Sequence, residues 1–207
     1  MIKNLIFDLG GVILNIDFSK SIEEFRKLGI TNIDELFSRY SQSKLFDMFE
    51  KGNISEKEFI ANLKKTIEKP VTNNQIYNAW NAMLLDFPMD RIELLKELNK
   101  KYRIFLLSNT NVIHNSVYNE LLNKKYGIND LTMLFEEAYY SFKLHMRKPD
   151  KEIFEYVLKG SKLNEEETVF IDDSPVNIKT AEKLGMKVVL YNPEDSLKDV
   201  LLENKIQ

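Results

Sequence analysis

The amino-acid sequence predicts an α/β protein with a mostly parallel sheet and a small helical domain inserted after the first strand. Short apolar segments that end at polar residues alternate with amphipathic segments of helical period along most of the chain. Because two parallel strands need a long crossover between them, this alternation is typical of parallel sheets covered by helices. One long stretch near the N-terminus has no strand pattern and predicts the inserted domain.

The predicted strands are short apolar runs, each followed by polar residues. The first is Leu5-Ile6-Phe7, which ends at Asp8 and meets the turn signal Gly10-Gly11. Three further runs have the same form, at residues 102–107, 168–171 and 187–191, and residues 136–141 are a weaker candidate. Continuous apolar runs of this length indicate strands that are buried on both faces.

Helical segments lie between these strands. Residues 89–101, 149–159 and 175–184 repeat apolar side chains at the spacing of one helix face. The third begins with Ser174-Pro175, which we interpret as a capping serine followed by proline at the first helical position. Gly185 then ends this helix.

Residues 19–83 contain no convincing strand and predict several helices. Ser55 and Glu58 have the spacing of a capping box at the start of one of them. We therefore expect a helical cap of residues 17–83 and a core of residues 1–16 and 84–207. The apolar faces expected in the cap are Phe59, Leu63 and Ile67 on one helix, and Ile76, Trp80 and Met83 on another.

Bulk composition excludes several classes of function. The 207 residues are 43% hydrophobic, enough for one compact core with a small insertion. The net charge of −3 is dispersed, so we expect no nucleic-acid partner. The absence of cysteine excludes disulfides, thiolate zinc sites and cysteine nucleophiles. The apolar run of residues 1–7 is too short for a signal peptide and no longer one follows, so we expect a cytoplasmic protein without membrane contact.

Polar residues stand at the ends of three predicted strands. Parallel sheets carry their sites at the carboxyl ends of their strands, so these residues should meet. Carboxylates crowd together only around a cation, and oxygen ligands favour magnesium over zinc. A lysine near them would offset the repulsion between carboxylates and a phosphate. The candidates are Asp8, Ser108-Asn109, Asp172-Asp173 and, in a loop before a helix, Lys148.

Each candidate also has a structural interpretation when taken alone. Asp8 could only end a strand, and Asp172-Asp173 could be ordinary turn residues. Ser108 could belong to a helix start capped by Thr110 or Asn111, although helix starts also bind anions. A lysine before proline is more often a solvated surface residue. Their occurrence together favours a site.

Four motifs in order resemble those of the haloacid dehalogenase superfamily, mostly phosphatases with a Rossmann-like, three-layer core. They are Phe7-Asp8-Leu9-Gly10-Gly11-Val12, Leu107-Ser108-Asn109, Arg147-Lys148-Pro149, and Ile171-Asp172-Asp173 with Asn177. The insertion after the first strand is similar to the helical cap of one subgroup. The resemblance spans nearly the whole chain and implies a phosphatase that uses Mg²⁺.

The resemblance implies a role for each matched residue. Asp8 would be the nucleophile, and Lys148 would lie near its carboxylate and bind the transferring phosphoryl group. Ser108, Asn109 and the glycine turn at Gly11 would also contact this group. The magnesium ligands would be Asp8, the Gly10 carbonyl, Asp172 and Asp173, with Asn177 orienting the metal shell.

One position departs from the family pattern. Its phosphatases usually carry an acid–base aspartate two residues after the nucleophile, and this chain has Gly10 there. General acid–base help is worth about 10²–10⁴-fold in rate. The candidates for a replacement acid are Asp17, His114 and His145, each of which also fits a plain structural role.

The glycine and its surrounding motifs resemble a bacterial subgroup that includes an α-D-glucose-1-phosphate phosphatase. We therefore expect a small phosphate ester, a sugar phosphate, as substrate and partner. The first alternative is a weakened sugar-phosphate-binding protein. The second is a 2-haloacid dehalogenase, which needs no leaving-group acid but leaves Asp172-Asp173 without a purpose. Mutase or phosphotransferase chemistry on the same residue is a third. Phe18, Phe46 and Trp80 are possible substrate contacts in the cap.

Overall fold

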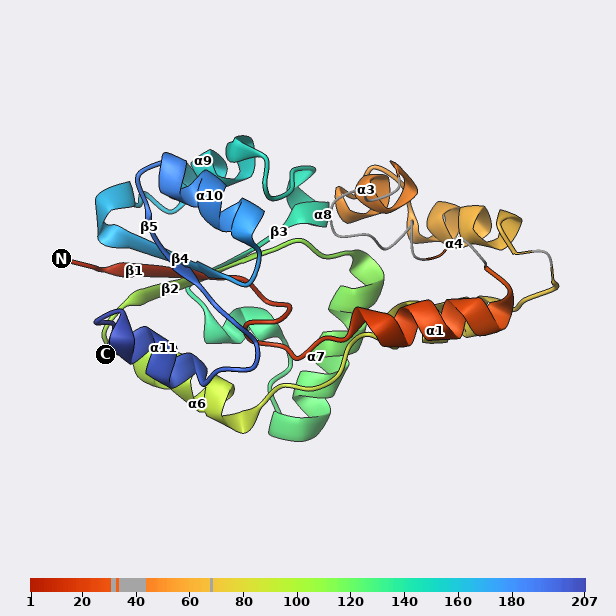
Figure 1. The fold of residues 1–207 in the computed structure, drawn as a ribbon, viewed down its shortest axis with the longest axis horizontal. Helices are drawn as coiled ribbons and strands as arrows, with labels where there is room; N and C mark the ends of the chain where they lie inside the picture. Colours follow the sequence, from red (N-terminus) through yellow and green to blue (C-terminus); the bar gives the residue numbers. More distant parts are fainter. Residues whose placement is uncertain (31–32, 34–43, 68) are drawn as a thin grey trace.

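The computed structural model describes residues 1–30, 33, 44–67 and 69–207, and a five-stranded sheet forms its centre (Figure 1). All neighbouring strands are parallel, in the spatial order β3-β2-β1-β4-β5. All five predicted strand segments are confirmed, including the weaker candidate at 136–141. The strands are β1 (Asn4–Phe7), β2 (Arg103–Ser108), β3 (Glu137–Tyr140), β4 (Thr168–Asp172) and β5 (Lys187–Leu190).

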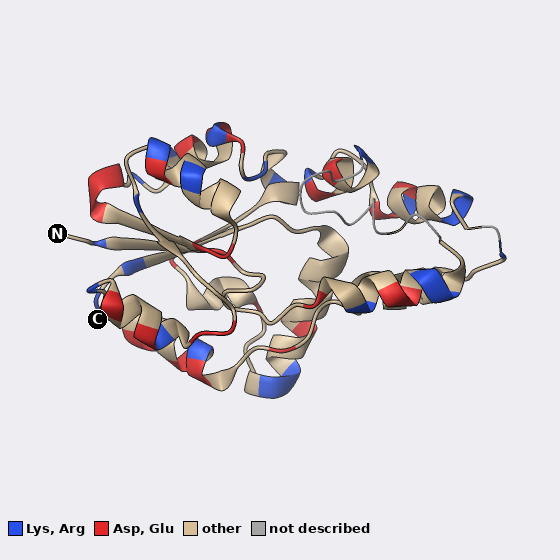
Figure 2. Cartoon of the chain, in the orientation of Figure 1, with Lys and Arg blue, Asp and Glu red and all other residues tan. Residues whose placement is uncertain are grey.

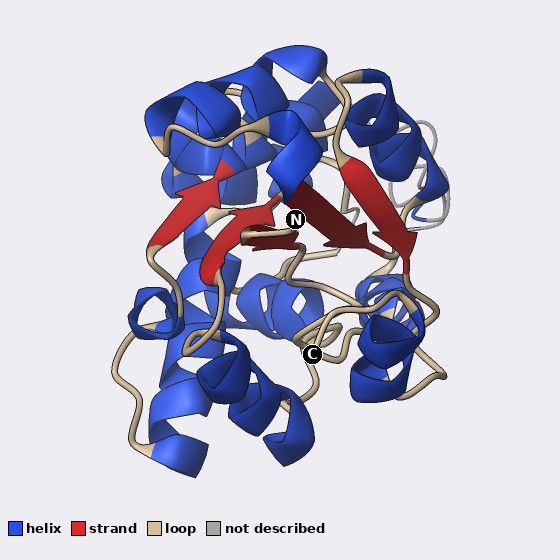
Figure 3. Ribbon diagram, turned by 90° about the vertical axis from the view of Figure 1, so that its left-hand side faces the viewer, coloured by secondary structure: helices blue, strands red, loops and turns tan. Residues whose placement is uncertain are grey.

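Side chains of the central strands alternate between two hydrophobic clusters, one on each face of the sheet. Leu5 and Phe7 of β1 pack into one cluster and Ile6 into the other. Helices cover both faces, as the α/β prediction requires (Figures 1 and 3). One face carries α6 (Met89–Leu98), α7 (Val112–Tyr126) and α11 (Leu197–Glu203), and the other α9 (Lys151–Gly160) and α10 (Pro175–Lys183).

The inserted segment forms helices beyond the carboxyl ends of the strands (Figure 1). They enclose a second hydrophobic cluster, which Ile113 of α7 also joins. It contains Phe59, Leu63, Ile67, Ile76 and Trp80 as predicted. Residues 31–32, 34–43 and 68, which belong to the expected cap, lie outside the described residues. The described helices of the segment are α1 (Phe18–Leu28), α3 (Lys44–Glu50), α4 (Glu56–Lys65) and α5 (Asn73–Asn81).

Two connections join these helices to the sheet, and they run side by side. Ile16 and Leu84 form an isolated antiparallel bridge. The Asn15 amide donates to the Asp86 carbonyl at 2.9 Å, and the Asp17 amide donates to the Met83 carbonyl at 2.9 Å. The chain therefore leaves the sheet and returns to it through one paired linker.

Local signals for helix ends were correct at some positions and wrong at others. Ser55 and Glu58 form the predicted capping box at the start of α4. Ser174 precedes α10 but its side chain makes no capping hydrogen bond, so Pro175 alone marks that start. Met83 is buried, but it lies beyond the end of α5 and outside the cap cluster.

The surface carries both signs of charge. Lys and Arg are interspersed with Asp and Glu along the helices, and acidic residues also occupy the loops at the strand ends that face the inserted helices (Figure 2). Among the described residues, no helix has the length and apolar character needed to cross a membrane.

Candidate active site

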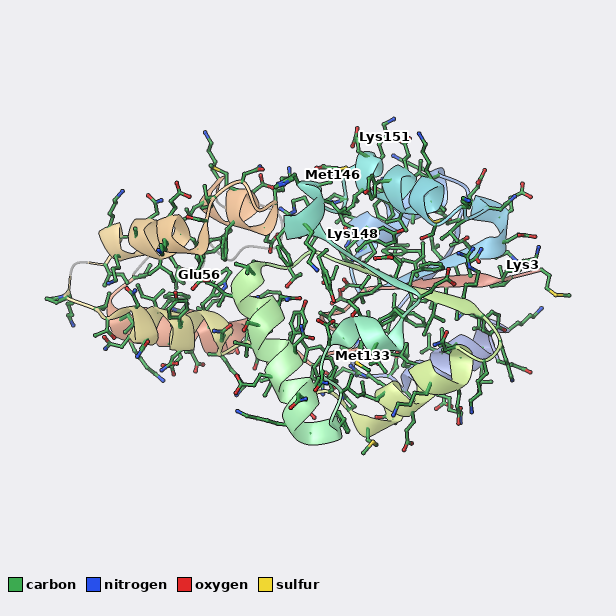
Figure 4. All side chains as sticks on the ribbon, turned by 180° about the vertical axis from the view of Figure 1, so that it is seen from behind. Lys3, Glu56, Met133, Met146, Lys148 and Lys151 are labelled. Atoms are coloured by element: carbon green, nitrogen blue, oxygen red, sulfur yellow. The ribbon has the colours of Figure 1, made fainter. Side chains whose placement is uncertain are left out.

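The strand ends bring the predicted polar residues together at the edge of the sheet that faces the inserted helices. Asp8 directly follows β1, Ser108 ends β2 and Asp172 ends β4. Lys148 comes from the loop between α8 (Ser141–Leu144) and α9. Figure 4 labels Lys148 in the middle of the molecule, between the sheet and the inserted helices, whereas Lys3 lies at the far end of the sheet.

Lys148 bridges two of the carboxylates. Its Nζ lies 2.7 Å from Asp8 Oδ1 and 2.7 Å from Asp172 Oδ2. Only 1% of Lys148 is exposed and Asp172 is fully buried, so this lysine is not the solvated surface residue of the alternative interpretation. Burial favours the neutral form of Lys148, but the Asp172 and Asp8 carboxylates raise the pKa of its ammonium above its usual value.

The Asp8 carboxylate is buried next to the Lys148 ammonium. Burial raises the pKa of its carboxyl group to about 7, although Lys148 lowers this pKa, while Asp172 raises it further. A nucleophilic carboxylate must be ionised. Added positive charge beside Asp8 would therefore favour the reactive form.

Three carboxylates form a group that fits a metal ion. Ligand oxygens of Asp8, Asp172 and Asp173 lie within 4.8 Å of one another. The Ser174 amide donates to Asp172 Oδ1 at 2.7 Å, and Asn177 Nδ2 donates to both Asp172 oxygens at 3.1 Å. Such contacts fix the orientation of a ligating carboxylate. A donor set of oxygens without nitrogen or sulfur suits a hard cation such as magnesium.

Gly11 makes room for this group. Its φ is +83°, and a Cβ atom placed there would lie 2.7 Å from Asp173 Oδ2. Its amide donates to the Leu14 carbonyl at 2.8 Å. Gly11 therefore permits the close approach of Asp173. The expected contact of this glycine with phosphate stays a prediction.

Asn109 holds the segment that carries the lysine. Its Nδ2 donates to the Lys148 carbonyl at 2.8 Å, and its Oδ1 accepts from the Lys148 amide at 2.9 Å. Its side chain thus positions Lys148, and no local pattern in the sequence predicts this contact. Ser108 is buried and lines the same cavity as Asp8. Of the two predicted helix caps, Asn111 is the one used: its side chain accepts from the His114 amide.

Two of the three candidate acids lie away from the cavity wall. Asp17 is the N-cap of α1 and accepts hydrogen bonds from the amide and hydroxyl of Ser19. His145 is exposed, and its Nδ1 lies 2.8 Å from the Lys51 carbonyl. Neither residue lines the cavity that contains Asp8. Both therefore have the plain structural roles that we considered for them.

His114 reaches the cavity, but its ring is poorly suited to donate a proton there. Nε2 lies 3.0 Å from the Trp80 carbonyl, which only accepts, and Nδ1 lies 3.2 Å from Asn111 Nδ2, which only donates. These partners assign a neutral ring with its proton on Nε2. Burial lowers the pKa of His114 to about 4, in agreement with this assignment.

This burial predicts a pH-dependent stability. Between pH 6.5 and 4 the unfolded chain protonates His114 and the folded chain does not, so the unfolded state binds more protons there. The free energy of unfolding should therefore fall by about 2 kcal/mol from pH 7 to pH 4.5 because of this residue. Urea titrations at pH 7 and pH 4.5 measure this change. The free energy of unfolding should fall by about 2 kcal/mol less in His114→Asn than in the wild-type protein. His145→Asn, at an exposed histidine, is the control; an equal pH dependence in all three proteins would contradict the buried neutral ring.

The site opens into a cavity of about 210 Å³ between the strand ends and the inserted helices. Asp8, Ser108 and Lys148 of the core line this cavity. The possible substrate contacts expected in the cap, Phe18, Phe46 and Trp80, line it too. Sequence reasoning missed two charged lining residues, Glu50 and Arg147. Arg147 adjoins Lys148 in a motif, but nothing in the helical period of α3 marked Glu50.

Comparisons with known proteins agree with this architecture. Residues 2–185 match the model of the haloacid dehalogenase-like hydrolase family. D-ribitol-5-phosphate phosphatase of Bacteroides thetaiotaomicron is 32% identical over 197 residues, which are 94% of this chain and 93% of that protein. The 6-phosphogluconate phosphatase of Escherichia coli is 23% identical over 194 residues, which are 92% of this chain and 82% of that protein.

A solved structure is also closely similar. A HAD family enzyme from Bacteroides thetaiotaomicron, crystallised as the wild-type protein in complex with magnesium and inorganic phosphate, is 38% identical to this chain. The two structures align with a TM-score of 0.83 over 95% of this chain and 97% of that one. The similarity therefore includes the sheet and the inserted helices.

Proposed function

This chain belongs to the haloacid dehalogenase-like hydrolase family, among its phosphoric monoester hydrolases, and we propose that it is a magnesium-dependent phosphatase that forms an aspartyl phosphate on Asp8. The observation that carries the proposal is the buried bridge from Lys148 to Asp8 and Asp172, both at strand ends. The proposed substrate is a small phosphorylated sugar or polyol. The substrates of the two named relatives support this class.

In the proposed reaction a carboxylate oxygen of Asp8 attacks phosphorus. The bond from phosphorus to the ester oxygen breaks, and the alcohol leaves after its oxygen gains a proton. Water then attacks the phosphorus of the aspartyl phosphate, which releases inorganic phosphate and restores Asp8. Lys148 and Ser108 hold the phosphoryl oxygens in line, and positioning and charge stabilisation supply most of the acceleration in such reactions.

The three clustered carboxylates are the proposed magnesium ligands. Asp8, Asp172 and Asp173 would hold the ion together with the Gly10 carbonyl, while Asn177 orients Asp172. Magnesium, when bound, would stabilise negative charge on the phosphoryl oxygens. Its charge would also favour the ionised form of Asp8, whose pKa burial raises.

The family usually carries an acid at the position of Gly10. None of the three candidate replacements, Asp17, His114 and His145, is placed to donate a proton to the leaving group. The proposed phosphatase therefore suits a leaving oxygen of low basicity, such as that of a sugar 1-phosphate, or one that water in the cavity protonates. A catalytically weakened sugar-phosphate-binding protein remains the alternative that Gly10 favours.

We further propose that residues 17–83 act as the cap, and residues 1–16 and 84–207 as the core. The paired linker at Ile16 and Leu84 supports these bounds, as does a hydrophobic cluster formed mainly by the inserted helices. Since Phe18, Phe46 and Trp80 of the inserted segment line the same cavity as Asp8, the cap would contact the part of the substrate that leaves.

The test is phosphate release from a panel of sugar, polyol and nucleotide monophosphates, with magnesium and with a chelator. We expect release from sugar or polyol phosphates that stops in the chelator. Release from none of them, by protein shown to bind magnesium, would favour the binding protein. Halide release from 2-haloacids that survives the chelator would favour the dehalogenase.

Gly11→Ala should raise the magnesium concentration needed for half-maximal activity by about tenfold or more, as changes beside metal ligands do. The new methyl group would displace Asp173 from the carboxylate group. Activity measured across a magnesium titration checks this. Gly127→Ala is the matched control, because Gly127 has a φ of +68° but no atom within 4 Å of a new Cβ. The same magnesium requirement in both variants would contradict the role given to Gly11.

A further inference from the structure

We propose that Glu50 and Arg147 are a specificity-determining pair that restricts the site to phosphate esters whose leaving group is uncharged. The inference rests on the proposed phosphatase function and deepens it. Lys148 and the carboxylates at the strand ends can act on any phosphate ester, so selection among esters must come from other residues that line the cavity. Glu50 and Arg147 are charged lining residues that the proposed chemistry does not use.

The pair joins the cap to the core beside the reacting lysine. Arg147 lies next to Lys148 in the chain, and its Nη2 is 3.2 Å from Glu50 Oε2. Its Nη1 is 3.2 Å from Asp47 Oδ1. Glu50 and Asp47 are three residues apart on α3, so both reach the guanidinium from one face of that helix. The side chains of Arg147 and Glu50 are only 16% and 17% exposed, so water screens their charges weakly.

The charges that line the cavity disfavour a substrate with a second anionic group. Among the described lining residues, the cationic side chains are Arg147 and Lys148, since the His114 ring is neutral. Lys148 is paired with Asp8 and Asp172, and Arg147 with Asp47 and Glu50. A second anionic group on a substrate would therefore compete with Glu50 for the Arg147 guanidinium, and the Glu50 carboxylate would repel it. Discrimination of this kind comes from a repulsive contact as much as from an attractive one.

An uncharged polyhydroxy leaving group fits the same surroundings. Its hydroxyl groups can donate to the Glu50 carboxylate and accept from the Arg147 guanidinium. Its carbon-bound hydrogens can pack against the apolar wall, which Phe18, Phe46 and Trp80 form. The cavity of about 210 Å³ accommodates a leaving group of a few carbon atoms rather than a polymer. The inferred class is the monophosphate esters of neutral sugars and polyols.

Two substrates that differ at one carbon test the inference. Glucitol 6-phosphate ends in a hydroxymethyl group where 6-phosphogluconate ends in a carboxylate. We expect kcat/KM of the wild-type protein to be at least about tenfold higher for glucitol 6-phosphate. The ratio of the two values does not depend on how much of a preparation is active, so it separates specificity from a general loss of structure.

Variants of the pair should move this ratio in opposite directions. Glu50→Gln removes the repelling charge at nearly constant shape and should lower the preference for glucitol 6-phosphate about tenfold. Arg147→Gln leaves Glu50 without its cation and should raise the preference. Asp47→Asn is the matched control, since Asp47 pairs with the same guanidinium but does not line the cavity, and it should keep the ratio within about twofold.

The outcomes separate this inference from the proposed function. Hydrolysis of both esters at equal kcat/KM by the wild-type protein would overturn the inference and leave the phosphatase intact. A ratio that Glu50→Gln does not move, or moves no more than Asp47→Asn does, would overturn it too. Hydrolysis of no phosphate ester at all would overturn the proposed function, and this inference with it.

Discussion

Asp8→Asn should lower kcat by at least about 10⁴-fold, because an amide oxygen cannot replace the carboxylate as a nucleophile toward phosphorus. The variant should keep its fold, since the substitution changes shape very little and removes a charge whose burial is unfavourable: burial raises the pKa of Asp8 to about 7. Steady-state kinetics with the best ester of the panel, together with circular dichroism, measures both effects.

Asp17→Asn is the matched control for this change. Asp17 is a carboxylate of the linker region that caps α1 and does not line the cavity. Its variant should retain activity within about threefold of wild type and nearly unchanged stability, because asparagine caps a helix about as well as aspartate. Near-full activity in Asp8→Asn would show that the reaction does not pass through Asp8.

Lys148→Met should lower kcat by about 10³-fold, because the phosphoryl group loses a buried positive charge that is already in position. It should also destabilise the magnesium-free protein by about 3 kcal/mol, since Asp8 and Asp172 are left buried without their shared cation. Denaturant titration without magnesium measures the second effect. Magnesium should then stabilise this variant more than it stabilises the wild type, because the ion would replace the missing charge.

Lys151→Met is the control for the loss of a lysine. Lys151 lies three residues further along the chain, and its exposed ammonium pairs with Glu155 on the surface of α9. Surface pairs of this kind contribute at most about 1 kcal/mol. If Lys148→Met were no less stable than Lys151→Met and equally active, the buried bridge would have neither the structural nor the catalytic role given to it.

Much of the core could be predicted from the sequence because its signals are local. A strand such as β1, buried on both faces, must be a continuous apolar run, and the polar residue that ends it stands out. Parallel strands then bring Asp8, Ser108 and Asp172 to one edge without further information. Lys148 could be predicted only from its motif, since its burial depends on a loop folding over those carboxylates.

The contacts that the sequence did not reveal are tertiary. Asn109 holds both backbone groups of Lys148, and only the approach of two distant loops makes this possible. Glu50 lines the cavity because α3 packs against the loop that carries Arg147. The spacing of apolar residues in a short helix does not reveal such a distant partner. Gly11 leaves space for Asp173, and no local pattern in the sequence shows this second role of the glycine.

The central claim is that a phosphoryl group passes through the Asp8 carboxylate, and trapping this intermediate tests it most directly. Protein mixed with magnesium and substrate, quenched in acid during turnover and treated with borohydride, should contain homoserine in place of aspartate at position 8, because borohydride reduces an acyl phosphate. Peptide mass spectrometry reads the modified position, and protein without substrate should remain unmodified. Phosphate release at a normal rate with position 8 unchanged, or with the modification at Asp172 or Asp173 instead, would contradict the account.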